Sequence, residues 1–141
     1  MKYKNKMLLI FIIISILLIF FLLTKKNGFI SSELNGYEIT NVRSNILNSE
    51  YPIFVNFYTG DNGYRKYNDK LVESLNKFNL PYYIVEINSK GHKWTRICQQ
   101  KPYILLNVLN KFPNKHVVWI DADAIIEKKT KLLKNINKDF A

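Results

Sequence analysis

Residues 117–126 read VVWIDADAII, and this stretch joins a strongly apolar run to two carboxylates, Asp121 and Asp123. A short continuous run of β-branched and aromatic residues is typical of a strand that is covered on both faces of a sheet. Because burying an unpaired carboxylate is costly, both Asp are expected where the strand ends and meets solvent. The tripeptide D-x-D is common by chance, so its meaning depends on the rest of the chain.

The residues before this stretch alternate between strand and helix patterns. YPIFVNFY (51–58) and YYIVEI (82–87) are apolar, β-branched and aromatic, which predicts two further buried strands. Apolar residues recur at helical spacing over 66–79 and again over 100–112, and each set marks one face of a helix. With a third strand over 116–120, the order strand, helix, strand, helix, strand predicts an α/β fold built on a parallel, Rossmann-like sheet.

The predicted sheet gives the two Asp a defined place. In an open α/β sheet, ligands bind outside the carboxyl ends of the strands. Asp121 and Asp123 follow the third strand, and their expected neighbours are the loops 59–64 and 88–96 that follow the first two strands. The sequence therefore predicts a ligand site at this edge.

A second apolar segment lies near the N-terminus. Residues 7–23, MLLIFIIISILLIFFLL, contain Ser15 as their one polar side chain and span ~25 Å as a helix, the short end of what crosses a bilayer. The segment predicts a transmembrane signal-anchor that follows a cytoplasmic tail of residues 1–6. A cleaved signal peptide is the alternative, although LLTKKNGF offers no small-x-small cleavage site.

Downstream of that segment, residues 24–50 mix Gly, Ser and Asn with isolated apolar residues and predict a stalk, with a short helix near 42–47. The folded domain is then expected over 51–141. A slight excess of lysine before the apolar segment favours a cytoplasmic N-terminus, so we expect a single-pass type II membrane protein with its domain in the lumen of the ER or Golgi. The net charge of +10 suits a solvated surface, an anionic ligand or lipid head groups, and nucleic acid is disfavoured because the anchor would hold the domain away from it.

Two carboxylates at one strand end suit a hard divalent cation. In extended backbone, residues i and i+2 point the same way, so Asp121 and Asp123 can face one ligand while Ala122 packs inward. Oxygen anions of this kind hold Mg²⁺ or Mn²⁺, which keep open positions for water or diphosphate oxygens. The alternative is that both Asp only start a turn and cap the segment that follows.

Two quoted stretches resemble one enzyme group. WTRICQQKPYILLNVLNKFPNKHVVWIDADAII (94–126) resembles the segment of nucleotide-diphospho-sugar glycosyltransferases of the GT-A fold in which a Lys-Pro-led helix runs into a hydrophobic strand and the D-x-D motif. VNFYTGDNGY (55–64) and LPYYIVEI (80–87) resemble the first βαβ unit of the same group. The similarity spans 51–126 and lies in the ordered series of elements.

The resemblance implies roles for particular residues. Asp123 would be the main metal ligand, and Asp121 would contact the ribose or donor sugar and reach the metal through water. Phe57, Tyr58 and Thr59 would lie against the nucleotide base and ribose, although a place in the core is equally compatible with Phe57. The implied cofactor is Mn²⁺ or Mg²⁺, and the implied substrate is a nucleotide-diphospho-sugar donor.

The basic and indole side chains of the second stretch are less specific. The resemblance makes Lys101 and Arg96 candidate contacts to the donor, although solvated lysine and arginine are equally compatible with the pattern. Trp94 is expected mainly to pack, and Trp119 is expected in the core because it lies inside the predicted strand. The sequence indicates no catalytic base.

One departure from the group concerns length. GT-A domains normally continue well past D-x-D, whereas eighteen residues follow Asp123 here, and 128–141 can form only a basic amphipathic helix. That helix would turn its apolar side chains inward, namely Leu132, Leu133, Ile136 and Phe140. The resemblance therefore predicts the N-terminal half of a truncated GT-A-type fold. The chain is then expected to be either a fragment, with a second-half polypeptide as a possible partner, or a degenerate relative of the group.

Three functions follow from these observations. The first is a membrane-anchored glycosyltransferase, or its donor-binding half, that transfers a sugar from a nucleotide-diphosphate donor to an acceptor the sequence does not identify. The second is a non-catalytic, membrane-tethered remnant or interaction protein of the same fold. The third is a D-x-D phosphatase with Asp121 as nucleophile and Asp123 as acid/base, which the third-strand position of the motif disfavours.

Overall fold

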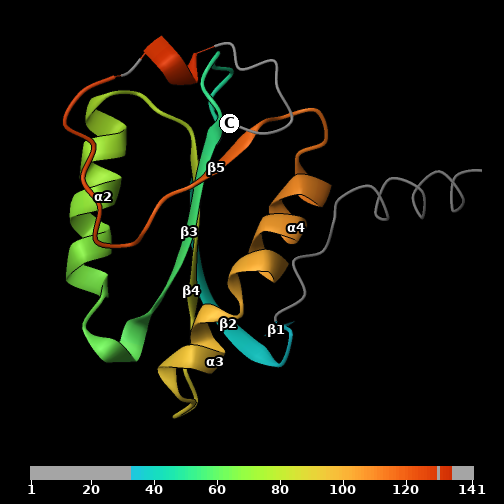
Figure 1. The fold of residues 1–141 in the computed structure, drawn as a ribbon. Coiled ribbons are helices and arrows are strands. Elements are labelled where there is room, and N and C mark those ends of the chain that lie inside the picture. Colours follow the sequence, from blue (N-terminus) through green and yellow to red (C-terminus); the bar gives the residue numbers. More distant parts are fainter. Residues whose placement is uncertain (1–32, 130, 135–141) are drawn as a thin grey trace, which may run out of the picture. The chain divides into compact units, whose positions relative to one another are not determined.

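The computed structural model describes residues 33–129 and 131–134. Within this part of the chain the elements form three layers, with one sheet between two layers of helix (Figure 1). Helix α2 (Arg65–Lys77) covers one face of the sheet, and helices α3 (Trp94–Cys98) and α4 (Lys101–Lys111) cover the other (Figure 1).

The three strands expected from the apolar runs are present and pair in parallel. Strand β3 (Ile53–Thr59) lies between β4 (Tyr82–Ile87) and β5 (Val117–Trp119). Every residue of β4 is buried, and so are six of the seven residues of β3, as continuous apolar runs predict for strands with helices on both faces. These strands form the centre of the described fold.

The prediction of an entirely parallel, Rossmann-like sheet is wrong, because the sheet is mixed. Strand β2 (Tyr37–Asn45) pairs antiparallel with β4, and β1 (Glu33–Leu34) pairs antiparallel with β2. Residues 37–45 lie in the predicted stalk, and a strand replaces the first part of the short helix expected near 42–47. Strand β2 pairs with the edge of β4. Without β2, this apolar strand would have an exposed edge that could pair with another chain.

The predicted membrane-spanning segment, residues 7–23, and the tail before it lie outside the described residues. Between residues 33 and 134, leaving out Thr130, no helix has both the length and the apolar character needed to cross a bilayer.

The two longer helices bury one face each. In α2, Leu71, Val72 and Leu75 are buried against Phe54 and Tyr58 of β3. In α4, Ile104 and Val108 are fully buried, whereas Leu109, expected on the same face, is 45% exposed. Pro102 lies in the first turn of α4, where its missing N–H is harmless.

The strand order β1-β2-β4-β3-β5 contains a change of direction. From β3 the chain passes through α2 to β4 on one side, and from β4 it passes through α3 and α4 to β5 on the other side of β3. The carboxyl ends of β3 and β5 therefore flank a topological switch point, where open α/β sheets bind their ligands.

After β5 the chain runs alongside α2 and ends its described part in a 3-10 turn, Lys131–Leu133 (Figure 1). The backbone N–H of Ile126 donates a hydrogen bond to Ser74 Oγ of α2 at 3.0 Å. The amphipathic helix expected over 128–141 is not present at its start, and Leu132, expected inward, is 89% exposed. Residues 135–141 lie outside the described part of the chain.

Candidate functional site

A cleft of about 350 Å³ opens at the carboxyl ends of β3 and β5, and we call it the switch-point cleft. Its volume is within the ~300–1,000 Å³ that is usual for small-molecule sites. Its walls come from the end of β3, the loop before α2, helix α3, the start of α4 and the turn after β5. The lining residues are Phe57, Tyr58, Thr59, Tyr64, Trp94, Cys98, Lys101, Trp119, Asp121, Ala122 and Asp123.

The two carboxylates project from a turn. Strand β5 ends at Trp119, and the N–H of Ala124 donates to the carbonyl oxygen of Asp121 at 3.1 Å, which closes a turn over residues 121–124. The expectation that extended backbone aims both carboxylates the same way is therefore wrong. Both Asp are nevertheless exposed and line the same cleft.

The two carboxylates differ in their partners. Asp121 Oδ1 accepts a hydrogen bond from Trp119 Nε1 at 2.8 Å, which fixes one of its oxygens. Asp123 has no hydrogen bond or ion pair with any other residue in the described part of the chain. Asp123 is thus the freer of the two groups to bind a ligand.

The two carboxylates can supply part of the coordination shell of a divalent cation. Within residues 33–129 and 131–134 no group of three or more His, Cys, Asp or Glu side chains converges, so the chain offers two carboxylates and no closed cage. Mg²⁺ typically binds through one or two carboxylates and completes its octahedron with water and substrate phosphates. The donor set therefore suits a cation that arrives with, or is completed by, a phosphorylated ligand.

Trp119 forms a wall of the cleft, whereas the sequence predicted it in the core. Its ring meets Phe57 edge to face, with centroids 5.8 Å apart, and Lys101 Nζ lies 4.4 Å from its centroid. The ammonium group of Lys101, at the start of α4, is thus held in the cleft by a cation–π contact with Trp119. The cleft thus carries the ammonium group of Lys101 as well as the carboxylates of Asp121 and Asp123.

Thr59 ends β3 and lines the cleft. The residue is 1% exposed, and its hydroxyl has no hydrogen-bond partner in the described part of the chain. A buried hydroxyl without a partner is unfavourable, and a polar ligand atom in the cleft would supply one. Among the predicted site residues, Thr59 is thus the one with a buried hydroxyl that a bound ligand would satisfy.

Tyr58 also lines the cleft, but its hydroxyl is committed elsewhere. The hydroxyl donates to Glu86 Oε2 of β4 at 2.7 Å, and Arg65 donates to the other oxygen of Glu86. Burial, together with the hydrogen bond and the negative charge of Glu86, raises the pKa of Tyr58 to about 12. The nucleotide contact implied for Tyr58 is thus limited to its ring, while its hydroxyl anchors β3 to β4.

Two aromatic residues of the cleft were missing from the predicted site. Tyr64 and Trp94 stack with centroids 5.4 Å apart and planes 9° from parallel, and Trp94 is 53% exposed. Trp94 was expected mainly to pack and Tyr64 was given no role of its own, although both lie in the loops 59–64 and 88–96 that were expected beside the two Asp. Both follow the carboxyl ends of parallel strands, Tyr64 after β3 and Trp94 after β4, so the loops were predicted here while the stacked aromatic pair was not.

Among the predicted donor contacts, Arg96 does not join the cleft. Trp94 and Cys98 lie one turn apart on the face of α3 toward the switch-point cleft, whereas Arg96 lines a second cavity on the other side of α3. The structure therefore brings together Phe57, Tyr58, Thr59, Lys101, Asp121 and Asp123, and it separates Arg96 from them.

Comparisons of the chain with protein-family models, with curated proteins and with solved structures found no match.

Proposed function

We propose that the switch-point cleft binds a nucleotide-diphosphate sugar together with Mg²⁺ or Mn²⁺, as the donor site of a glycosyltransferase. The observation that carries the proposal is the gathering of two carboxylates, one ammonium group and a buried, unpartnered hydroxyl around one cleft at the switch point. The binding step rests on this geometry. The transfer step rests on the resemblance of residues 51–126 to nucleotide-diphospho-sugar glycosyltransferases.

Each group in the cleft has a role that suits such a ligand. Asp123, which has no partner in the described part of the chain, would hold the cation, and Asp121 would use the oxygen that Trp119 does not occupy. Lys101 would attract the diphosphate, and the Thr59 hydroxyl would bond a polar atom of the nucleoside or sugar. When bound, the cation would neutralise charge that develops on the departing diphosphate.

The aromatic walls favour a ligand with a flat ring. Trp94 is half exposed and already stacked on Tyr64, so its outer face is available to a nucleobase. Stacking of this kind contributes ~1–3 kcal/mol per base and tolerates any base. The aromatic walls therefore support a nucleotide without selecting among nucleotides.

Tryptophan fluorescence can be used to test the proposal. It has two tryptophans, Trp94 and Trp119, and both line the switch-point cleft, so the indole emission of the protein reports on this site. Titration of the full chain with UDP- and GDP-sugars should change that emission saturably when Mn²⁺ is present and much less when the metal is chelated.

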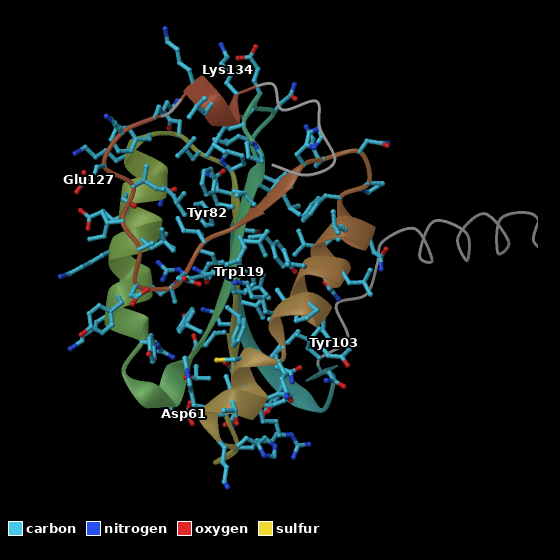
Figure 2. The ribbon with its side chains drawn as sticks, in the orientation of Figure 1. Asp61, Tyr82, Tyr103, Trp119, Glu127 and Lys134 are labelled. Atoms are coloured by element: carbon cyan, nitrogen blue, oxygen red, sulfur yellow. The ribbon has the colours of Figure 1, made fainter. Side chains whose placement is uncertain are left out.

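A matched pair of variants makes the test specific. Asp123→Ala should abolish the metal-dependent response. Glu127→Gln removes an exposed carboxylate four residues away that does not line the cleft, and it should leave the response unchanged (Figure 2). Binding that ignores the metal, or an absent response in folded protein, would refute the proposal.

A further inference from the structure

A second cavity, of about 420 Å³, lies on the opposite side of α3 from the switch-point cleft, and we call it the α3 cavity. It is bordered by the β1–β2 hairpin, by α3 and by the first turn of α4, where Figure 2 shows Tyr103. Its polar and aromatic lining consists of Asn35, Tyr37, Arg96, Gln99, Gln100 and Tyr103. None of the functions considered above uses this cavity.

Tyr37, which lines the α3 cavity, has a buried hydroxyl without a partner among the described residues. Tyr37 is 2% exposed, and its hydroxyl has no hydrogen-bond partner in the part of the chain that the structure describes. The Tyr37 ring is held by an edge-to-face contact with His92, with ring centroids 5.1 Å apart. A polar ligand atom would remove the cost of leaving this hydroxyl unsatisfied.

The amides next to Tyr37 have spare donors. Asn35 Nδ2 donates to Gln100 Oε1 at 3.3 Å, and Gln100 Nε2 donates to the carbonyl oxygen of Arg96 at 3.4 Å. Both distances are at the long end for hydrogen bonds, and each amide nitrogen carries two protons. Gln100 is 2% exposed, so its amide is a fixed part of the wall.

The charge of the α3 cavity has one sign. Arg96 is the one charged residue in its lining, and it makes no ion pair with any described residue. The part of α3 and α4 that borders the cavity, residues 93–103, adds Lys93 and Lys101 and no Asp or Glu, whereas the hairpin adds the exposed Glu38 outside the lining. A guanidinium fork surrounded by amide and hydroxyl donors matches a carboxylate or a phosphate group.

We propose that the α3 cavity is a second binding site, for a small ligand that carries a carboxylate or phosphate group. Arg96 pairs with the oxyanion, the Tyr37 hydroxyl and the side-chain amides of Asn35 and Gln100 donate to it, and Tyr103, which is 48% exposed, covers the rest of the ligand. The site is separate from the switch-point cleft and does not depend on the proposed donor-binding function.

Side-chain nuclear magnetic resonance tests the site with simple probes. Inorganic phosphate and sodium acetate are titrated separately into the isotope-labelled full chain, and the side-chain amide signals of Asn35 and Gln100 are followed. A saturable shift of both signals is expected with at least one probe, and the probe that binds more tightly identifies the phosphate or the carboxylate as the preferred group.

Three variants distinguish the α3 cavity from general positive charge. Arg96→Gln should weaken binding about tenfold or more, and Tyr37→Phe should weaken it severalfold, because each removes a donor to a charged group. Lys115→Gln, which removes an exposed lysine that lines neither cavity, should leave the titration unchanged. The absence of a saturable shift with either probe, or equal binding by Arg96→Gln, would overturn the proposal.

Discussion

Glu86 is a buried carboxylate near the carboxyl end of the otherwise apolar strand β4, and its two partners explain why it is tolerated. It is 5% exposed, and it accepts hydrogen bonds from Tyr58 on β3 and from Arg65 at the start of α2. Burying an unpartnered carboxylate is strongly unfavourable, so these bonds offset a large desolvation cost. The same bonds tie β4 to the end of β3 and to α2, next to the switch-point cleft.

Gly60 is the residue that leaves room for this carboxylate. A Cβ at position 60 would overlap Glu86 Oε1, which cannot turn away without breaking its bond to Arg65. We expect Gly60→Ala to lower the free energy of unfolding by about 1–3 kcal/mol, measured by urea denaturation. In a Glu86→Ala background the overlap is gone, so the same substitution should cost clearly less. An equal cost in both backgrounds would contradict this explanation.

The raised pKa of Tyr58 predicts a dependence of stability on pH. Its phenol stays protonated to about pH 12 in the folded chain, whereas an unfolded tyrosine ionises near pH 10. Between these values the folded state holds the extra proton, so the stabilisation from this group is complete below pH 10 and is lost as pH rises toward 12. The urea midpoint of Tyr58→Phe should therefore fall less steeply with pH over this range than that of the wild type. Parallel curves would show that Tyr58 does not contribute.

At the residue scale the sequence located the Asp pair and misjudged Trp119. Asp121 and Asp123 could be placed because an apolar strand must end where charges begin. Trp119 was expected in the core because residues inside a buried strand usually pack there. The pattern of a single strand does not say which of its faces borders a cleft, and in the structure Trp119 faces the cleft with Lys101 above its ring.

At the scale of elements, α2 holds the chain that follows the Asp turn. Ser74 Oγ accepts the N–H of Ile126 at 3.0 Å and donates to the carbonyl oxygen of Leu71 at 2.7 Å, so one side chain joins the helix to the segment. Ala122 and Ile126 of that segment also pack against the core beneath α2. The position of the Asp turn therefore depends on this contact.

Removing the Ser74 hydroxyl tests that dependence. Ser74→Ala should lower the free energy of unfolding by about 1 kcal/mol, because the Ile126 N–H loses its acceptor. Hydrogen exchange at the Ile126 amide should accelerate, while exchange within β4 stays slow. As a control, Asp69→Asn on the same helix alters an exposed ion pair with Arg43 of β2 and should change exchange at Ile126 little. Unchanged exchange at Ile126 in Ser74→Ala would show that apolar packing alone holds the segment.

The elements that could be predicted were those with a clear hydrophobic period. Strands β3, β4 and β5 and helices α2 and α4 follow from apolar runs and helical spacing. Strand β2 could not be found in this way, because YEITNVRSN is mostly polar and its residues are largely half-buried or exposed at the side of the sheet. Helix α3, at five residues, is too short to show a period, so the division of its residues between two cavities was not predictable.

At the scale of the whole molecule, the strand order explains why one place collects the functional groups. The chain goes from β3 to β4 on one side of β3, and later from β4 to β5 on the other side. This reversal opens a crevice between the carboxyl ends of β3 and β5. Residues that are more than sixty positions apart, such as Thr59 and Asp123, come to line that crevice. The resemblance predicted this grouping for six of its seven residues, and it failed for Arg96 because α3 turns that side chain away.

The most direct test of this account is the effect of Mn²⁺ on the two indole N–H signals of the protein. The two tryptophans line the switch-point cleft, and Trp119 Nε1 lies 2.8 Å from Asp121 Oδ1, so a paramagnetic ion held by the Asp pair must broaden both signals. With Mn²⁺ and a nucleotide-diphosphate sugar, we predict strong broadening in the wild type and in Glu127→Gln, and none in Asp123→Asn. Signals that stay sharp in the wild type, or that broaden equally in Asp123→Asn, would contradict a metal and donor site in this cleft.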